Sequence, residues 1–218
     1  MIKLLHIWIV DVVGVECDSS VHLNHRSLAA IATQLVFSIT TKKMSEFKPQ
    51  VTQAFLIEKY KMQPHPEGGY YVESFRSDQE ILVNNNQTRK ASTAIYFLIN
   101  KTSVSRMHRI KSDEIWHFYM GKSMSVIELD KASGGFKRTI LGSDIMNGEV
   151  VQYTVKAGTW FGSHPNLEGD TDEDAFSFVG CTVAPGFEFA DFELGSKKEL
   201  LEEYPNATDM INKLTVGL

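Results

Sequence analysis

The chain has 218 residues, of which 43% are hydrophobic and 22% are charged, so one globular domain with a substantial core fits within it. Its formal net charge of -5 at pH 7 argues against a nucleic-acid partner, because phosphate binding needs clustered lysine and arginine side chains. No uninterrupted apolar run approaches the roughly 20 residues of a membrane-spanning helix, so no membrane partner is expected. Cys17 and Cys181 are too few for a disulfide framework and favour a cytoplasmic location.

Residues 1–50 show no sustained hydrophobic period, and we treat them as an N-terminal extension whose structure the sequence does not define. Lys3 and the apolar stretch that follows it have the outline of a secretory signal peptide. However, His6 and Asp11 interrupt this stretch and no small-residue cleavage site follows. Secretion is therefore the minority alternative to a cytoplasmic location.

The pattern after residue 50 predicts one short helix and then many strands. Val51, Phe55 and Tyr60 follow helical spacing within residues 51–62, and Pro64 prevents the helix from continuing. Short segments rich in β-branched and aromatic residues follow, separated by clusters of Gly, Asn, Asp and Ser. These segments are residues 69–77, 92–100, 113–121, 124–130, 150–158 and 175–183. Their number and spacing favour an antiparallel all-β sandwich or barrel.

A second short helix is predicted near the C-terminus. Ser196 and Glu199 have the spacing of a capping box, and an apolar stripe follows them and ends before Pro205. The simplest interpretation is a helix packed on the barrel. The chain then divides into the extension (1–50), a β-barrel domain (51–205) and a C-terminal tail (206–218).

The densest group of candidate functional residues lies in residues 107–121, which contain His108, Glu114 and His117. Strand alternation places Glu114 and His117 on opposite faces, so only one of them can face a barrel interior. His108 precedes a turn and can lie on the neighbouring strand with its imidazole beside the Glu114 carboxylate. Such a pair can bind a divalent metal ion, exchange protons with a substrate, or form a buried ion pair.

Other polar and aromatic side chains are candidates for substrate binding. Glu73 and Arg76 are three residues apart on a predicted strand and therefore point to opposite faces, with Glu73 the expected pocket carboxylate and Arg76 expected at the surface or an interface. The amide of Gln152 can donate and accept hydrogen bonds to a base or a sugar. Trp160 offers a flat stacking surface, although packing in the barrel core is the competing interpretation.

Several of these segments resemble a known family. The spacing from Glu114 to Gly121 fits the first cupin motif, and residues 151–161 lie where the second motif is expected. The segments HPEGGYYVESFRS, STAIYFLI, HRIKSDEIWHFYMG and GCTVAPGFEFADFELG are similar to the uncharacterised cupin family called cupin 5. The resemblance implies a cupin-type jelly-roll barrel with short flanking helices, a ligand pocket at one mouth, and pairing as a homodimer.

The sequence departs from the metal-binding cupin pattern in both motifs. The first motif retains only one histidine, His108, and Phe161 stands where the second motif would have a histidine ligand. His108 and Glu114 remain as two candidate metal ligands, whereas a tight catalytic site normally has at least three protein donors. One divalent metal ion is thus the possible cofactor, and metal-free chemistry is the favoured alternative.

The leading hypothesis is an isomerase or epimerase that acts on a sugar, sugar phosphate or sugar nucleotide. His108 would be the proton-transfer base and Glu114 its partner, while Glu73, Gln152 and Trp160 would position the substrate. The alternative is a non-catalytic module that binds a nucleobase, nucleotide or sugar. A metal-dependent oxygenase is a third hypothesis, which requires two histidines and a carboxylate around the metal.

Overall fold

The first described element is a short helix, α3 (Gln53–Tyr60). This computed structural model describes residues 50–83 and 86–217, so the predicted extension, with Cys17 and the possible signal peptide, lies outside the described residues. The side chain of Thr52 caps the helix by accepting a hydrogen bond from the Phe55 backbone N–H at 3.2 Å. Lys61 ends it in a left-handed conformation. The helix is therefore shorter at both ends than the predicted span of 51–62.

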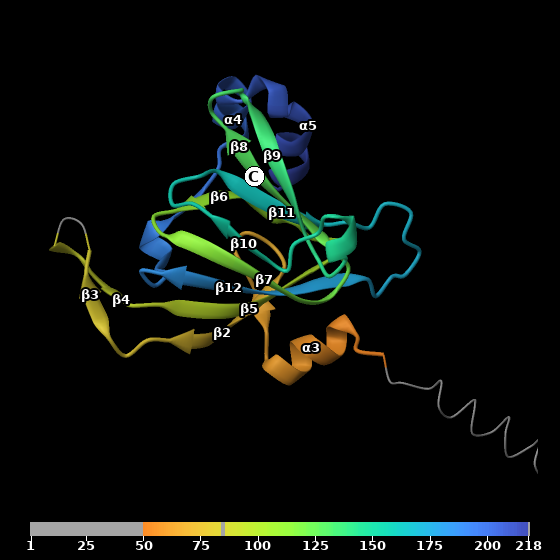
Figure 1. Cartoon of the computed structure of the whole chain (residues 1–218), viewed down its shortest axis with the longest axis horizontal. Coiled ribbons are helices and arrows are strands. Elements are labelled where there is room, and N and C mark those ends of the chain that lie inside the picture. Colours follow the sequence, from red (N-terminus) through yellow and green to blue (C-terminus); the bar gives the residue numbers. More distant parts are fainter. Residues whose placement is uncertain (1–49, 84–85, 218) are drawn as a thin grey trace, which may run out of the picture. The chain divides into compact units, whose positions relative to one another are not determined.

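Two antiparallel sheets form the body of the domain (Figure 1). Across the six-stranded sheet the order is β1 (Gln63–Pro64), β2 (Tyr70–Arg76), β5 (Thr93–Asn100), β12 (Phe176–Ala184), β7 (Asp113–Gly121) and β10 (Gln152–Val155). Across the five-stranded sheet it is β13 (Phe192–Leu194), β6 (Ser105–Ile110), β11 (Phe161–Pro165), β8 (Met124–Asp130) and β9 (Gly135–Leu141). The predicted all-β jelly-roll barrel with short flanking helices is confirmed.

The main hydrophobic core lies between the two sheets. Phe97 and Trp116 point into it from the six-stranded sheet, and Val126 and Phe161 from the five-stranded sheet. All four side chains are almost completely buried. Alternate residues of each strand fill this interior, as the period-2 pattern predicts.

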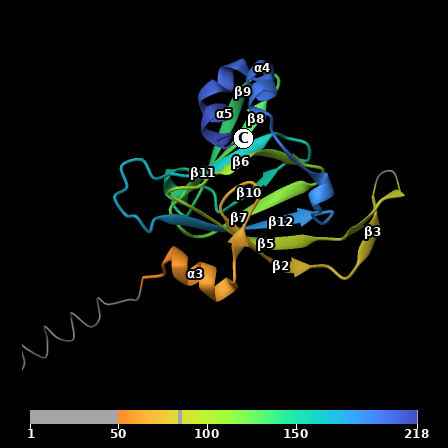
Figure 2. The same cartoon turned by 180° about the vertical axis from the view of Figure 1, so that it is seen from behind.

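A two-stranded hairpin leaves the body between β2 and β5. It consists of β3 (Glu80–Leu82) and β4 (Thr88–Lys90) and forms a separate small sheet. Both views show it beside the barrel, with its far end away from the two large sheets (Figure 2). Its returning strand leads directly into β5, so the hairpin is a lateral arm of the six-stranded sheet.

The C-terminal segment packs helices against the five-stranded sheet. After α4 (Lys197–Glu203) and a 3-10 turn, η4 (Pro205–Ala207), comes a further helix, α5 (Thr208–Leu214). Ile211 and Leu214 of α5 are fully buried against Met107 and Ile127 of the barrel. Ala207, Ile211 and Leu214, which fall in the predicted C-terminal tail (206–218), therefore contribute to the core. The Ser196 side chain makes no capping hydrogen bond, so the expected capping box does not form.

Two local features of the strands decide which side chains meet inside the barrel. β6 and β7 are consecutive in sequence but belong to different sheets, because the chain crosses between the sheets at residues 111–112. In β2, consecutive residues of β5 face Glu73 and Phe75, so Ser74 is the extra residue of a β-bulge. None of the helices in the described part of the chain is long and apolar enough to cross a lipid bilayer.

Candidate functional site

A cavity of about 260 Å³ opens at one end of the barrel, between the two sheets. This volume lies slightly below the range of about 300–1,000 Å³ that drug-sized ligands occupy, so the cavity suits a small molecule. Carboxyl groups, two imidazoles and an aromatic wall line it. The lining residues include His65, Glu67, Tyr71, Glu73, Arg76, His108, Glu114, Cys181, Phe187, Glu188, Phe189 and Phe192.

His108 forms a buried contact with a carboxylate from a loop. Its Nε2 lies 3.2 Å from Oε2 of Glu67, and its Nδ1 lies 2.7 Å from the carbonyl oxygen of Arg106. Because a carbonyl oxygen only accepts, Nδ1 carries the hydrogen and the neutral ring presents a lone pair at Nε2. Burial lowers the pKa of His108, against the opposing effect of Glu114. The imidazole is therefore held in the tautomer that can accept a proton from the cavity.

Glu67 is held by partners on the loop and on β6. Ser105 donates to Glu67 Oε1 at 2.9 Å, and the backbone N–H of Glu67 donates to Nδ1 of His65 at 3.2 Å. Burial raises the pKa of Glu67, although His65 and Ser105 act in the opposite direction. The raised pKa of Glu67 and the lowered pKa of His108 favour one proton shared between the two side chains.

The turn that carries Glu67 depends on the glycine that follows it. Gly68 has a φ of +110°, and a Cβ built on it would lie 2.2 Å from the carbonyl oxygen of Val104. Only glycine allows the loop to approach so closely to the backbone of Val104, the residue before β6. The backbone of Arg106 also donates to the carbonyl of Glu67 at 2.8 Å. The loop is thus fixed against the edge of β6 with the Glu67 carboxyl directed inward.

Glu114 enters the cavity from the opposite sheet to His108. Its side chain is buried, and burial raises its pKa to about 7, with Glu67 adding to the rise and His108 opposing it. Glu114 pairs with Val183 of β12, and its side chain meets that of Cys181, two residues earlier on the same strand. Burial raises the pKa of the Cys181 thiol well above its ordinary value. Near neutral pH Glu114 can therefore act either as a proton donor or as a proton acceptor, whereas Cys181 stays a neutral thiol.

The raised pKa of Glu114 gives a testable dependence of stability on pH. Because the folded state holds this proton more tightly than the unfolded state, stability falls as pH rises from about 4.5 to about 7. The loss amounts to about 3 kcal/mol above both values. We expect Glu114→Gln to remove this loss. The free energy of unfolding of the variant, measured by urea denaturation and compared with that of wild type, should therefore be more favourable at pH 8 than at pH 4. The exposed Glu58→Gln is the control, and identical pH profiles for wild type and Glu114→Gln would contradict the prediction.

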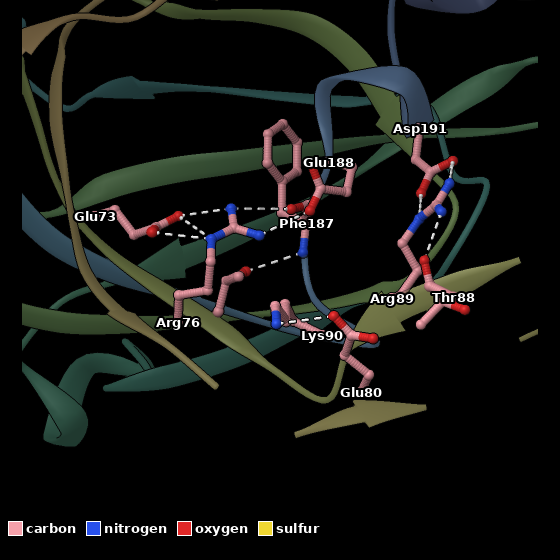
Figure 3. A network of polar contacts seen from close by, with 10 residues as sticks. Glu73, Arg76, Glu80, Thr88, Arg89, Lys90, Phe187, Glu188 and Asp191 are labelled. Carbon is pink, nitrogen blue, oxygen red and sulfur yellow. Dashed lines mark hydrogen bonds and ion pairs between the residues drawn. The ribbon is translucent and has the colours of Figure 1, made fainter. Parts of the chain in front are cut away.

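An arginine lies at the mouth of the cavity between two carboxylates (Figure 3). The Arg76 Nε and one terminal nitrogen donate to Glu73 at 3.0 and 2.7 Å, and the other terminal nitrogen donates to Glu188 at 2.7 Å. Both carboxylates raise the pKa of Arg76, Glu73 most strongly. Beside this group, Arg89 holds the pKa of Asp191 at about 2 and ties the turn η3 (Phe189–Asp191) to the hairpin arm.

The structure brings together three of the five predicted site residues. His108, Glu114 and Glu73 all line the cavity. The sequence predicts that His108 lies on the strand next to that of Glu114, as in a hairpin. This prediction is wrong, because β6 and β7 belong to opposite sheets. The direct partner of His108 is Glu67.

Gln152 and Trp160 lie outside the lining of this cavity. Gln152 is exposed on β10, opposite His117 of β7. Trp160 packs with the helix-facing core, and the Arg109 guanidinium lies 4.4 Å from its ring centroid. The structure thus gives both side chains packing or surface contacts in place of the expected ligand contacts.

The expectation that only one of Glu73 and Arg76 faces inward is wrong. Both line the cavity, while Phe75 between them is 53% exposed. The bulge at Ser74 adds one residue to the strand, so side chains three positions apart point to the same face. Arg76, expected at the surface or at an interface, is therefore part of the site.

The donor set does not fit a tightly held catalytic metal ion. Among residues 50–83 and 86–217, no three His, Cys, Asp or Glu side chains are placed to hold one. Phe161, which stands in the sequence where the second cupin motif would have a histidine, packs its ring on His108 with 4.2 Å between the ring centroids. The predicted pair of ligands, His108 and Glu114, stays below the three protein donors of a catalytic site.

Sequence reasoning missed His65, Glu67 and Glu188. His65 and Glu67 fall in the segment HPEGG, which predicts a turn after the helix and belongs to no strand pattern. One signal could have indicated them: a histidine and a glutamate stand together in a turn rich in Gly and Pro, and functional side chains often lie on loops. Glu188 lies in an aromatic segment of the chain that has no regular period.

These observations define a class of protein: an antiparallel jelly-roll barrel with a polar cavity of small-molecule size between its sheets. Residues 54–195 match the family model described as Cupin superfamily (DUF985). The chain belongs to this family of cupins. The resemblance stated from the sequence is thereby confirmed.

Individual relatives agree with this assignment. An uncharacterised Saccharomyces cerevisiae protein, YML079W, is 32% identical over 149 residues, which cover 62% of this chain and 71% of the yeast protein. A hypothetical protein from Leishmania major has a similar solved structure, with a TM-score of 0.69, 34% identity, and coverage of 75% of this chain and 98% of that one. Protein SO0799 from Shewanella oneidensis gives a TM-score of 0.67, 36% identity, and coverage of 76% and 98%.

Proposed function

We propose that this protein is an isomerase or epimerase that moves a proton at a carbon next to a carbonyl group in a sugar-like substrate. The observation that carries the proposal is the buried contact between His108 Nε2 and Glu67 Oε2 at 3.2 Å, with Glu114 facing the same cavity. Three groups that can exchange protons thus surround a space of small-molecule size. Their perturbed pKa values are typical of functional sites.

The two sides of the cavity suit a reaction that needs both a base and an acid. His108 belongs to β6 of one sheet, and Glu114 belongs to β7 of the other. A substrate between them meets His108 and Glu67 on one side and the Glu114 carboxyl on the other. Once Glu67 has released the shared proton and is ionised, the free Nε2 of the neutral imidazole removes the proton from the carbon and the Glu67 carboxylate stabilises the imidazolium that forms. The protonated Glu114 gives its proton to the carbonyl oxygen or to the opposite face of the carbon.

The walls of the cavity support this chemistry by restricting water. Phe187, Phe189 and Phe192 pack against each other and cover one side, with ring centroids 5.1 to 6.3 Å apart. Tyr71 adds a further ring, which lies nearly perpendicular to the His65 ring with 4.5 Å between the ring centroids. Apolar rings also stack on the C–H faces of sugars, while carboxylates accept hydrogen bonds from their hydroxyl groups.

The structure narrows the non-catalytic alternative, ligand binding without a reaction, from nucleobases and sugars to sugars. Reading of a nucleobase by Gln152 and Trp160 loses its support, because neither residue lines the cavity. Simple binding of a sugar by the same walls remains the second candidate, since the fold alone does not imply a reaction. The homodimer implied by the family resemblance and the cytoplasmic location both stay predictions.

Deuterium exchange tests the proposal directly. Wild-type protein is incubated in D₂O with a panel of aldoses and ketoses, and NMR follows the signal of each proton next to the carbonyl. We expect loss of that signal, dependent on the protein, for at least one sugar, together with the epimer or isomer as product. If the folded protein binds a sugar of the panel without any exchange, the binding function replaces the enzymatic one.

A further inference from the structure

The charges that line the cavity are unevenly distributed. Four glutamates, Glu67, Glu73, Glu114 and Glu188, line it, and Arg76 is the only lysine or arginine among the described residues that do. The two histidines supply no fixed positive charge, because burial lowers the pKa of both His65 and His108. Among the described side chains that line the cavity, Arg76 is therefore the one fixed positive charge.

Arg76 is already engaged by more negative charge than it carries. Its guanidinium donates to both oxygens of Glu73, to Glu188, and to the carbonyl oxygen of Phe187 at 3.4 Å. Figure 3 shows it lying between the two carboxylates. We call the three side chains Glu73, Arg76 and Glu188 the mouth clamp. With two carboxylates and one guanidinium, the mouth clamp has a net charge of -1.

An anionic ligand would meet excess negative charge at this mouth. A phosphate group that approached the one remaining N–H of Arg76 would lie beside Glu188, and one that displaced Glu73 or Glu188 would lie beside the displaced carboxylate. Repulsion between like charges separated by about 4 Å is substantial even near a protein surface. Unfavourable charge placement of this kind is a general means of rejecting wrong ligands.

We propose that the mouth clamp excludes phosphorylated and other anionic ligands, so that the site takes an uncharged, unphosphorylated sugar. The sugar in this statement rests on the proposed function; the exclusion of anions rests on the clamp alone. The cavity volume of about 260 Å³ agrees with a small substrate without a nucleotide group. Among the three substrate types of the leading hypothesis, this selects the simple sugar over the sugar phosphate and the sugar nucleotide.

The test uses inorganic phosphate as the probe and needs no catalytic activity. The imidazole nitrogen signals of His65 and His108 are followed by NMR in ¹⁵N-histidine-labelled full-length protein during titration with phosphate, at constant pH and ionic strength. We expect no saturable shift for wild type. In the double variant Glu73→Gln/Glu188→Gln, Arg76 loses both anionic partners and a saturable shift appears, with affinity at least about tenfold higher than the wild-type limit.

Two further variants complete the design. Glu188→Gln alone, which leaves Glu73 in place, gives an intermediate gain and serves if the double variant folds poorly. Glu80→Gln removes a carboxylate that pairs with Lys90 on the hairpin arm, outside the cavity lining, and leaves the response as in wild type. Saturable phosphate binding by wild type, or a folded clamp variant without any gain, overturns the inference. Both results are independent of whether the protein catalyses proton exchange.

Discussion

Replacement of His108 by glutamine is expected to lower the rate of proton exchange in a substrate sugar by about 10²–10⁴-fold, the usual contribution of a positioned general base. Glutamine is close to histidine in size and keeps a polar group next to Glu67, but its amide cannot take up a proton at neutral pH. The loss should therefore appear in the rate of the chemical step, with sugar binding much less affected. Deuterium exchange at saturating sugar measures the first effect, and an NMR binding titration measures the second.

His117→Gln is the matched control for this experiment. His117 lies on β7, the strand of Glu114, but its ring faces away from the cavity lining and its Nε2 lies 3.1 Å from the hydroxyl of Thr182. We expect its replacement to leave the exchange rate close to that of wild type. Equal rates for His108→Gln and wild type would remove His108 from the proposed mechanism. A general loss in both variants would indicate an effect on the barrel and not on the site.

Replacement of Phe161 by alanine is expected to reduce the free energy of unfolding by about 3–5 kcal/mol. The ring is 1% exposed, lies in the core between the sheets, and packs on both His108 and Trp116. Alanine leaves a cavity that the surrounding strands cannot close, because five-stranded and six-stranded sheets hold its walls apart. Urea denaturation followed by fluorescence and circular dichroism together measures the change.

Phe136→Ala provides the comparison for this prediction. Phe136 is a phenylalanine of the same sheet, on the outer strand β9, and is 39% exposed. Its replacement removes the same atoms but leaves much less of a buried cavity, so the loss of stability is expected to be clearly smaller. Similar losses at both positions would show that Phe161 is not the packed core residue described above. Phe161→Leu should fall between wild type and Phe161→Ala, because most of the volume is kept.

The strands were predictable because their side chains alternate between a core and a surface. Residues 113–121 show this pattern clearly, and the structure buries Glu114 and Trp116 while it leaves Ile115 and His117 on the other face. Cavity residues on regular strands, such as His108, were accessible to the same reasoning. The family motifs added the jelly-roll topology, which alternation alone does not specify.

The remainder of the site depends on features that have no local pattern. Pairing of His108 with Glu67 joins two residues that are 41 positions apart, through a loop that only the folded barrel places against β6. The position of Arg76 depends on a bulge of one residue in β2. Strict alternation, which ignores the bulge, places Arg76 on the opposite face to Glu73. Crossing of the chain between sheets at residues 111–112 looks in the sequence like an ordinary hairpin turn. Tertiary contacts therefore decided each of these cases.

The bulge in β2 also affects how related sequences should be aligned. Because Ser74 is the extra residue of the strand, a relative that lacks it would return to strict alternation, and residues aligned with Glu73 and Arg76 would still point to the same side. A one-residue gap at this place therefore does not signal loss of the acid–arginine pair. A gap on either side of it, between residues 70 and 73 for example, would turn part of the strand over. Family-wide comparisons of the pocket should place gaps in this strand at Ser74.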